Sequence, residues 1–159
     1  MRMKRFGVLA TTVVLATLAL SVAARAGDQH SGTWKMNPAK STYNPGPAAK
    51  SATLRVDSDE NDFKINSEGT GGDGNPTHVE FSAKFDGKDY PVTGVPNADT
   101  VSVKRIDSNT VETKMKNAGQ VVMTVRSTVS KDGKTRTSIF KGKDAQGRDV
   151  NNVVVYDKQ

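Results

Sequence analysis

Hydrophobic and polar residues alternate along most of the chain from residue 51 onward. The clearest example is THVEFSAKF, where Val79, Phe81, Ala83 and Phe85 occupy every second position. Alternation with a period of two predicts β-strands that bury one face. Similar short runs recur at 51–57, 62–66, 89–94, 100–106, 110–116, 120–130, 134–140 and 150–158.

Turn-forming residues separate these runs at regular intervals. Asp86-Gly87 and Asp132-Gly133 carry the sequence that tight hairpin turns favour, and 107–109, 117–119 and 146–147 are similar. About nine or ten strands joined by short loops predict an all-β, antiparallel up-and-down meander. Because a long meander has exposed edges unless it closes, we expect an 8–10-stranded lipocalin-like barrel. A two-sheet sandwich is the alternative.

The first 26 residues have the pattern of a secretory signal peptide. MRMKR is basic, an apolar stretch follows, and Ala24-Arg25-Ala26 forms a small-residue cleavage site. A membrane anchor is the alternative, but the apolar stretch is short for a span of about 20 residues. We therefore predict cleavage after Ala26, a single domain over 27–159, a periplasmic or secreted location, and no stable membrane span after cleavage.

The composition of the chain limits the classes of molecule that it is expected to bind. Residues 27–159 hold 19 of the 23 basic residues and all 17 acidic residues, so their net charge is only +2. This balance argues against nucleic-acid binding. Leu54 is the only leucine in this range, whereas valine, which favours strands, is common. The chain has no cysteine, so the fold is expected to form without disulfides.

The first and last predicted strands resemble those of the calycins, the lipocalins and fatty-acid-binding proteins. The opening carries Gly32-x-Trp34 and the chain closes with VVVYDKQ, so the resemblance covers about residues 31–159. The chain also resembles small exported bacterial proteins that share GTWK-x-NP-x-KS and FDGKDYPVTG. The resemblance implies a lipocalin-like barrel in which Trp34 packs at the closed base.

Two departures from this family pattern concern the ligand site. Fatty-acid-binding proteins hold a carboxylate with an Arg-x-Tyr pair on the last strand, but the matching positions here are Val154 and Tyr156. Those proteins also have a helical lid after the first strand. Three prolines in the segment 37–50 exclude such a helix, so we expect a more open mouth.

Two short motifs suggest a cofactor or a metal. GTGGDG, residues 69–74, has the spacing of a dinucleotide-binding loop, but an alternating strand pattern rather than a helix follows it. We interpret it as a hairpin tip and predict no cofactor. DSDENDFKINSE, residues 57–68, resembles a calcium loop but has Asp62 where that loop needs glycine. We interpret it as an acidic hairpin turn and predict no metal site.

The sequence gives little support for catalysis. His30 and His78 are the only histidines, and no G-x-S-x-G motif is present. We expect His30 in a mobile N-terminal segment and His78 at the start of a strand, and predict no catalytic residue. An unrecognised enzyme is the third hypothesis, and it requires His78 inside a polar cleft.

The barrel interior is the remaining candidate site. Because the inward side chains are modest in size, the barrel either encloses a cavity or is flattened. The leading hypothesis is non-catalytic binding of a small apolar or amphipathic ligand in the barrel. Arg105, Arg126 and Arg136 are expected to point to solvent, but one buried in the barrel would hold a carboxylate or phosphate. The candidate ligand contacts are Trp34, Phe81, Phe85, Met123, Arg126 and Tyr156.

The alternative hypothesis is an envelope module that binds a protein or glycan without an internal ligand. Its contacts would come from the loops and the outer sheet face. Lys88, Asp89 and Tyr90, at a predicted loop, are candidates for such a rim. This hypothesis predicts an exposed apolar or aromatic patch.

Overall fold

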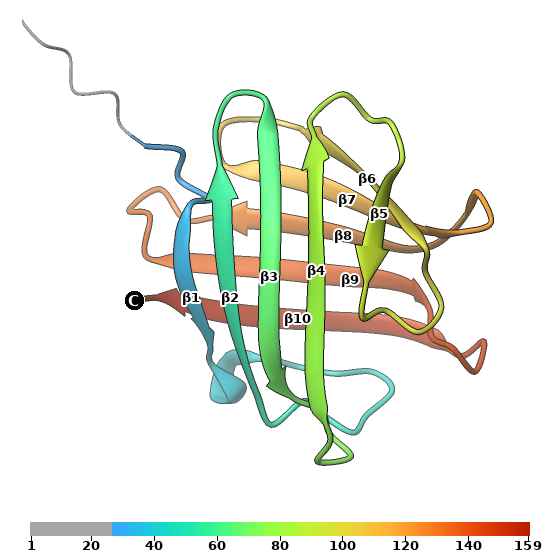
Figure 1. Ribbon diagram of the computed structural model, residues 1–159. Coiled ribbons are helices and arrows are strands. Elements are labelled where there is room, and N and C mark those ends of the chain that lie inside the picture. The colour runs from blue at the N-terminus through green and yellow to red at the C-terminus, as the bar shows by residue number, and fades with distance from the viewer. Residues whose placement is uncertain (1–26) are drawn as a thin grey trace, which may run out of the picture.

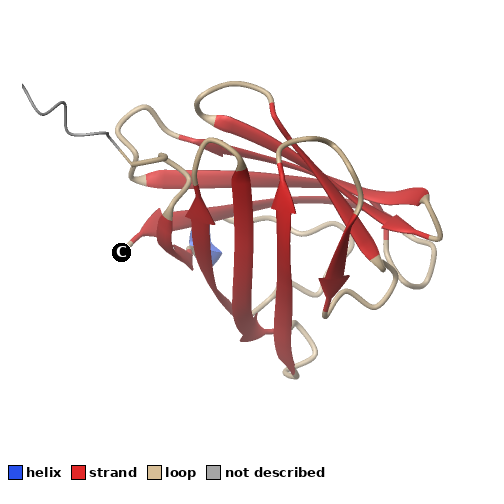
Figure 2. Cartoon of the chain, turned by 45° about the horizontal axis from the view of Figure 1, so that its top comes forward, coloured by secondary structure: helices blue, strands red, loops and turns tan. Residues whose placement is uncertain are grey.

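The computed structural model describes residues 27–159, so the predicted signal peptide of residues 1–26 lies outside the described range. The regular structure of the described chain is β-strand, apart from one 3₁₀ turn (Figures 1 and 2). The strands are β1 (Gly32–Met36), β2 (Ser51–Ser58), β3 (Asp62–Thr70), β4 (Pro76–Lys84), β5 (Tyr90–Thr93), β6 (Thr100–Arg105), β7 (Thr110–Asn117), β8 (Gln120–Val129), β9 (Thr135–Lys143) and β10 (Asp149–Lys158).

The ten strands form a closed antiparallel meander. Each strand pairs with the next one along the chain, and β1 pairs with β10 through Trp34 opposite Lys158 and Met36 opposite Tyr156. This confirms the predicted all-β barrel, and its closure removes the two exposed edges of an open meander. In Figure 1 the strands β1–β4 run across β8–β10, so two halves of the barrel wall cross at a steep angle.

The alternation in the sequence separates the inside of the barrel from the outside. In β4, Phe81 and Ala83 are buried, whereas Glu80, Ser82 and Lys84 are exposed. Because successive side chains of a strand point to opposite faces, a period of two places every apolar residue of such a run in the core.

The two segments with motif-like spacing are both hairpin turns. GTGGDG connects β3 to β4, and the Gly71 amide donates to the Asn75 carbonyl at 2.8 Å. The acidic segment contains the turn between β2 and β3. There one carboxylate oxygen of Asp59 accepts from the amides of Asn61 and Asp62 at 2.7 and 2.8 Å. A short Asp side chain that caps nearby amides is a common way to stabilise a turn.

One end of the barrel is closed by the residues just before β1. Trp34 is fully buried, and its indole N–H donates to the carbonyl of His30 at 2.9 Å. His30 is also fully buried, so the expectation that it lies in a mobile segment is wrong. The Lys158 ammonium lies 4.9 Å from the Trp34 ring centroid, in cation–π range. We refer to this end, formed by residues 28–34, as the base.

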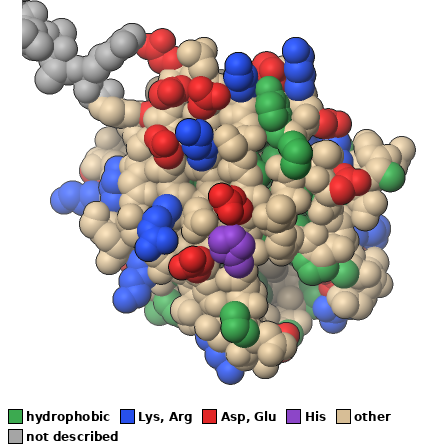
Figure 3. All heavy atoms as spheres, in the orientation of Figure 1, with side chains coloured by type: hydrophobic (Ala, Val, Ile, Leu, Met, Phe, Trp, Pro, Cys, Tyr) green, Lys and Arg blue, Asp and Glu red, His purple; other side chains and the backbone are tan. Residues whose placement is uncertain are grey.

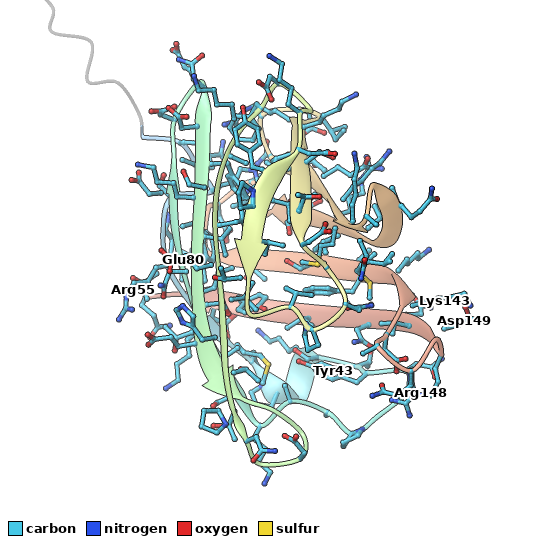
Figure 4. The ribbon with its side chains drawn as sticks, turned by 45° about the vertical axis from the view of Figure 1, so that its right-hand side comes forward. Tyr43, Arg55, Glu80, Lys143, Arg148 and Asp149 are labelled. Carbon is cyan, nitrogen blue, oxygen red and sulfur yellow. The ribbon has the colours of Figure 1, made fainter. Side chains whose placement is uncertain are left out.

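The proline-rich loop between β1 and β2 lies against β10. It contains a single 3₁₀ turn at Pro38–Lys40, and Thr42 bridges to Val153 in β10. The Tyr43 hydroxyl donates to the Met36 sulfur at 3.1 Å, and Figure 4 shows Tyr43 between this loop and the barrel. Within residues 27–159 no helix is long and apolar enough to cross a membrane.

Candidate functional site

The inner side of the barrel wall holds a cavity of about 170 Å³ that opens at a mouth. Inward-facing side chains of β2, β3, β4, β7, β8, β9 and β10 line it. The lining residues are Leu54, Phe63, Ile65, Ser67, Val79, Phe81, Thr113, Met115, Val125, Ser127, Arg136, Ser138, Phe140 and Tyr156.

The two sides of the cavity differ in polarity. The side formed by β2–β4 is apolar apart from Ser67 and includes Phe63 and Phe81, whose ring centroids are 6.2 Å apart. The side formed by β7–β10 carries the hydroxyls and the one charge. There Ser127 and Ser138 face each other across β8 and β9, and their hydroxyl oxygens are 2.8 Å apart. A molecule with one apolar and one polar side matches this division.

Arg136 supplies the only charged side chain of the cavity lining. It is 3% exposed, and its side chain makes one hydrogen bond, to His30 Nδ1 at 2.9 Å. Its Nε–H is buried and has no partner. Within residues 27–159 no carboxylate lies within ion-pair distance of Arg136. A buried cation without a paired anion is rare, because desolvating a charge is costly unless it is paired and hydrogen-bonded.

The contact with Arg136 fixes the proton of His30. Arginine can only donate, so His30 Nδ1 accepts and the ring proton is on Nε2. Burial and the charge of Arg136 lower the pKa of His30 to about 4, against a smaller opposing effect of Asp28. Burial lowers the pKa of Arg136 to about 10. At neutral pH the histidine is therefore neutral and the arginine is charged.

Tyr156 lies directly beside Arg136. The two residues are register partners across β9 and β10, so both side chains point inward from neighbouring strands. Burial, with a smaller effect of Tyr43, raises the pKa of Tyr156 to about 12, so its hydroxyl keeps its proton. Arg136 and Tyr156 thus place a guanidinium and a phenol hydroxyl side by side on β9 and β10.

The base connects to this site through His30. The His30 amide donates to Asp28 at 2.9 Å, and the other Asp28 oxygen pairs with Arg105. Burial raises the pKa of Asp28, but the His30 amide and Arg105 outweigh this effect and lower it. Asp28 therefore stays ionised and holds the base segment in place against β6.

The site runs from a deep end to a mouth. Along β9 the inward residues are Arg136, Ser138 and Phe140, each about 7 Å from the next. Arg136 contacts His30 at the base, and Phe140 is only half-buried. Val79 and Met115 also line the cavity and are half-buried. A ligand with its polar head on Arg136 would therefore extend its apolar part toward Phe140.

The structure brings together only some of the predicted ligand contacts. Phe81 and Tyr156 line the cavity, whereas Trp34 lies at the base. Phe85 packs on Phe63 with centroids 5.5 Å apart, outside the cavity lining. The other two candidates are Met123, which is half-buried, and Arg126, which is exposed on the outer face of β8; neither lines the cavity.

The sequence interpretation missed Arg136. It was expected to point to solvent, but it is buried in the phase of Ser138 and Phe140. The sequence did carry a pattern that indicates burial of Arg136, since Arg136, Ser138 and Phe140 occupy alternate positions in KTRTSIF. It was ambiguous because Ile139 occupies the opposite phase. His30 was missed as well, because its burial depends on how the chain crosses the base.

The outer surface carries mixed charges, and a polar hollow lined by Asp28, Asp59, Glu60 and Arg105 lies outside the base. His78 is exposed on β4 and lies 3.5 Å from Glu80. No group of three or more metal-binding side chains occurs in the described residues. Figure 3 shows acidic and basic side chains interspersed over one face, and in Figure 4 Arg55 and Glu80 point away from the barrel.

The described chain is a closed ten-stranded antiparallel barrel with a buried cation in an internal cavity. No family model matches the chain, and no curated protein matches it. Among solved structures, a redesigned β-barrel is similar, with 15% sequence identity and a TM-score of 0.46. The match covers 82% of this chain and 92% of that chain.

Proposed function

We propose that the protein is a non-catalytic binding protein that holds a small amphipathic molecule in its barrel. The apolar part of the ligand occupies the cavity, and its anionic head contacts Arg136 and Tyr156. The proposal includes the calycin-like class suggested by the two terminal strands. It also includes export to the periplasm or the medium, which the pattern of residues 1–26 favours.

The observation that carries this proposal is the buried, unpaired charge of Arg136. Desolvating an isolated ion costs several kcal/mol even after relaxation. The hydrogen bond to neutral His30, the Phe63 ring 5.9 Å away and the more distant charge of Asp28 offset only part of this. An anionic ligand would provide the missing partner. Carboxylates suit this role because a guanidinium binds them with two parallel hydrogen bonds.

The surroundings of Arg136 support binding rather than catalysis. Tyr156 and His30 are both neutral at physiological pH, and each has a pKa far from 7. A general acid or base works best with a pKa near the operating pH. The groups near Arg136 are therefore suited to fixing an anion and poorly suited to moving protons.

The first test is native mass spectrometry on the protein recovered from its own producing cells, followed by organic extraction. We expect a discrete added mass that extraction removes and that belongs to an acidic amphiphile. A bare polypeptide mass would count against a tightly held ligand.

A second test uses octanoate as a defined probe in calorimetric titrations. We expect one saturable site in the wild type and at least a tenfold loss of affinity in Arg136→Met, because a buried charge pair contributes strongly to complex stability. Arg126→Met removes the same charge from the exposed face of the neighbouring strand and should bind normally. Equal binding by all three proteins would exclude Arg136 as the anchor.

The alternative function is an interaction module that uses the outer face. One observation favours it: Val121 is 51% exposed and borders a hollow on β8–β10 together with Val122 and Val150. If mass spectrometry and titration both find no ligand, Val121→Lys should then abolish co-purification of a protein partner from the same cells.

A further inference from the structure

The cavity is small for a lipid-binding site. An apolar cavity of about 150 Å³ accommodates one benzene molecule, and the cavity here has about 170 Å³. It therefore has room for an apolar body of at most about six carbon atoms. A chain of 12 to 16 carbons would have to leave the cavity past Phe140 and Met115, which are half-buried at the mouth.

The lining offers one positive charge, and its other polar groups are the neutral hydroxyls of Ser67, Thr113, Ser127, Ser138 and Tyr156. Ser127 and Ser138 already hydrogen-bond to each other. Among the buried side-chain atoms of residues 27–159 that lack a partner, only Arg136 Nε belongs to the cavity lining. His30 is neutral because its Nδ1 accepts from Arg136. The site is thus built for one singly charged head.

The apolar side has the dimensions of a ring or a short chain. Phe63 and Phe81 pack at a tilt of 43° on one side, and Phe140 lies nearer the mouth. Leu54 and Ile65 complete this surface. Methylene groups inside this space would be desolvated, whereas those beyond the mouth would remain in contact with water.

We propose that the ligand is a compact monocarboxylic acid whose apolar body has about six carbons, such as a phenyl ring or a short alkyl chain. This inference rests on the proposed function and narrows it. The carboxylate binds Arg136 at the deep end, the body fills the cavity, and a longer chain adds no contact.

The test is a calorimetric series of straight-chain carboxylates from propanoate to dodecanoate, together with benzoate. Burial of one methylene corresponds to about fourfold in affinity. We expect this gain per carbon until the body has about six carbons and then a plateau within about twofold. Benzoate should bind about as tightly as heptanoate. A fourfold gain that continues to dodecanoate would overturn the compact ligand and leave the proposed function intact.

The head group is tested with three probes that share one ring. Benzoate should bind at least tenfold more tightly than benzyl alcohol, and more tightly than phenyl phosphate, because one guanidinium balances one charge. The difference between benzoate and benzyl alcohol should disappear in Arg136→Met and persist in Arg126→Met. Tighter binding of phenyl phosphate would overturn the assignment of a monocarboxylate.

The failures of the two proposals are distinguishable. If native mass spectrometry finds an acidic amphiphile but no compact acid binds, only the compact ligand is excluded. If no bound mass is found and none of the carboxylates binds, the proposed function itself fails.

Discussion

His30 joins the N-terminal segment to the cavity and is held neutral there. Its amide bonds to Asp28, its carbonyl accepts from Trp34, and its ring accepts from Arg136. Protonation of Nδ1 would remove the acceptor for Arg136 and place two cations in contact in a buried site. The titratable and charged groups that affect His30 most are Arg136, Asp28, Arg105 and Asp107.

The first prediction concerns stability against pH. The pKa of His30 is about 4 in the folded protein and ordinarily 6.5. Between these values the unfolded chain binds a proton that the folded chain does not, so the free energy of unfolding falls as pH falls from 6.5 to 4. The expected loss is on the order of 3 kcal/mol, measured by urea unfolding at several pH values.

His30→Gln is the matched variant for this prediction, since it keeps an acceptor for Arg136 but does not titrate. Carboxylates such as Asp28 titrate in both proteins, so the difference between the two curves isolates the histidine. Curves that run parallel from pH 7 to pH 4 would contradict the assignment.

The second prediction concerns the electrostatic coupling of His30 and Arg136. The charge of Arg136 is the second-largest cause that lowers the pKa of His30, after burial. Arg136→Met should therefore raise this pKa part of the way toward 6.5, as measured by NMR titration of the imidazole resonances. Arg126→Met, which removes the same charge from the exposed face of β8, is the control and should leave the His30 titration unchanged. An unchanged His30 titration would show that Arg136 does not act on it.

At the scale of elements, the two ladders of β5 are the shortest of the barrel wall. Two residue pairs join β5 to β4 and two join it to β6, compared with nine between β3 and β4. Gly94, just after β5, has a φ of +81°, and a Cβ there would lie 1.6 Å from the carbonyl oxygen of His78. The close approach of two backbones at this point therefore requires glycine.

The third prediction follows from this approach. Gly94→Ala should lower the free energy of unfolding by about 3 kcal/mol or more, because the backbone must separate from β4. Gly133→Ala is the control, since its φ is +71° and a Cβ there would meet nothing within 4 Å. It should cost only about 1–2 kcal/mol, for the left-handed conformation alone. Equal losses in thermal or urea unfolding would contradict a backbone overlap at Gly94.

The sequence pattern predicts the strands of the barrel better than it predicts the residues of the candidate ligand site. In β4 the apolar residues occupy one phase and the charged residues the other, so its buried face was predictable. In β9 both sets of alternate positions carry small or polar residues. The inward position of Arg136 therefore could not be predicted from the sequence. The burial of His30 also could not be predicted, because it lies before the first strand and depends on the path of the chain across the base.

At the scale of the whole molecule, closure brings the two ends of the described chain to the same end of the barrel. β1 pairs with β10, and the Gln159 amide donates to the Thr33 carbonyl at 2.9 Å. Residues 27–31 run from the base into β1. In an open sheet with the same strand order, β1 and β10 would instead lie at opposite edges, roughly 40 Å apart. Joining the ends therefore distinguishes a closed barrel from an open sheet.

The fourth prediction is that a circular permutant folds. Gln159 is joined to Asp28 by six Gly/Ser residues, which span about 13 Å on average, and the chain is opened between Ala145 and Gln146, in the exposed β9–β10 turn. All ten strand pairings are retained and the change in loop entropy is small, so we expect native circular dichroism and a cooperative thermal transition within about 10 °C of the wild type. Octanoate should still bind, because Arg136 and Tyr156 remain register partners. A permutant that is soluble only when the linker is extended to several tens of residues would show that β1 and β10 are not paired, and the barrel would have to be redrawn as an open sheet.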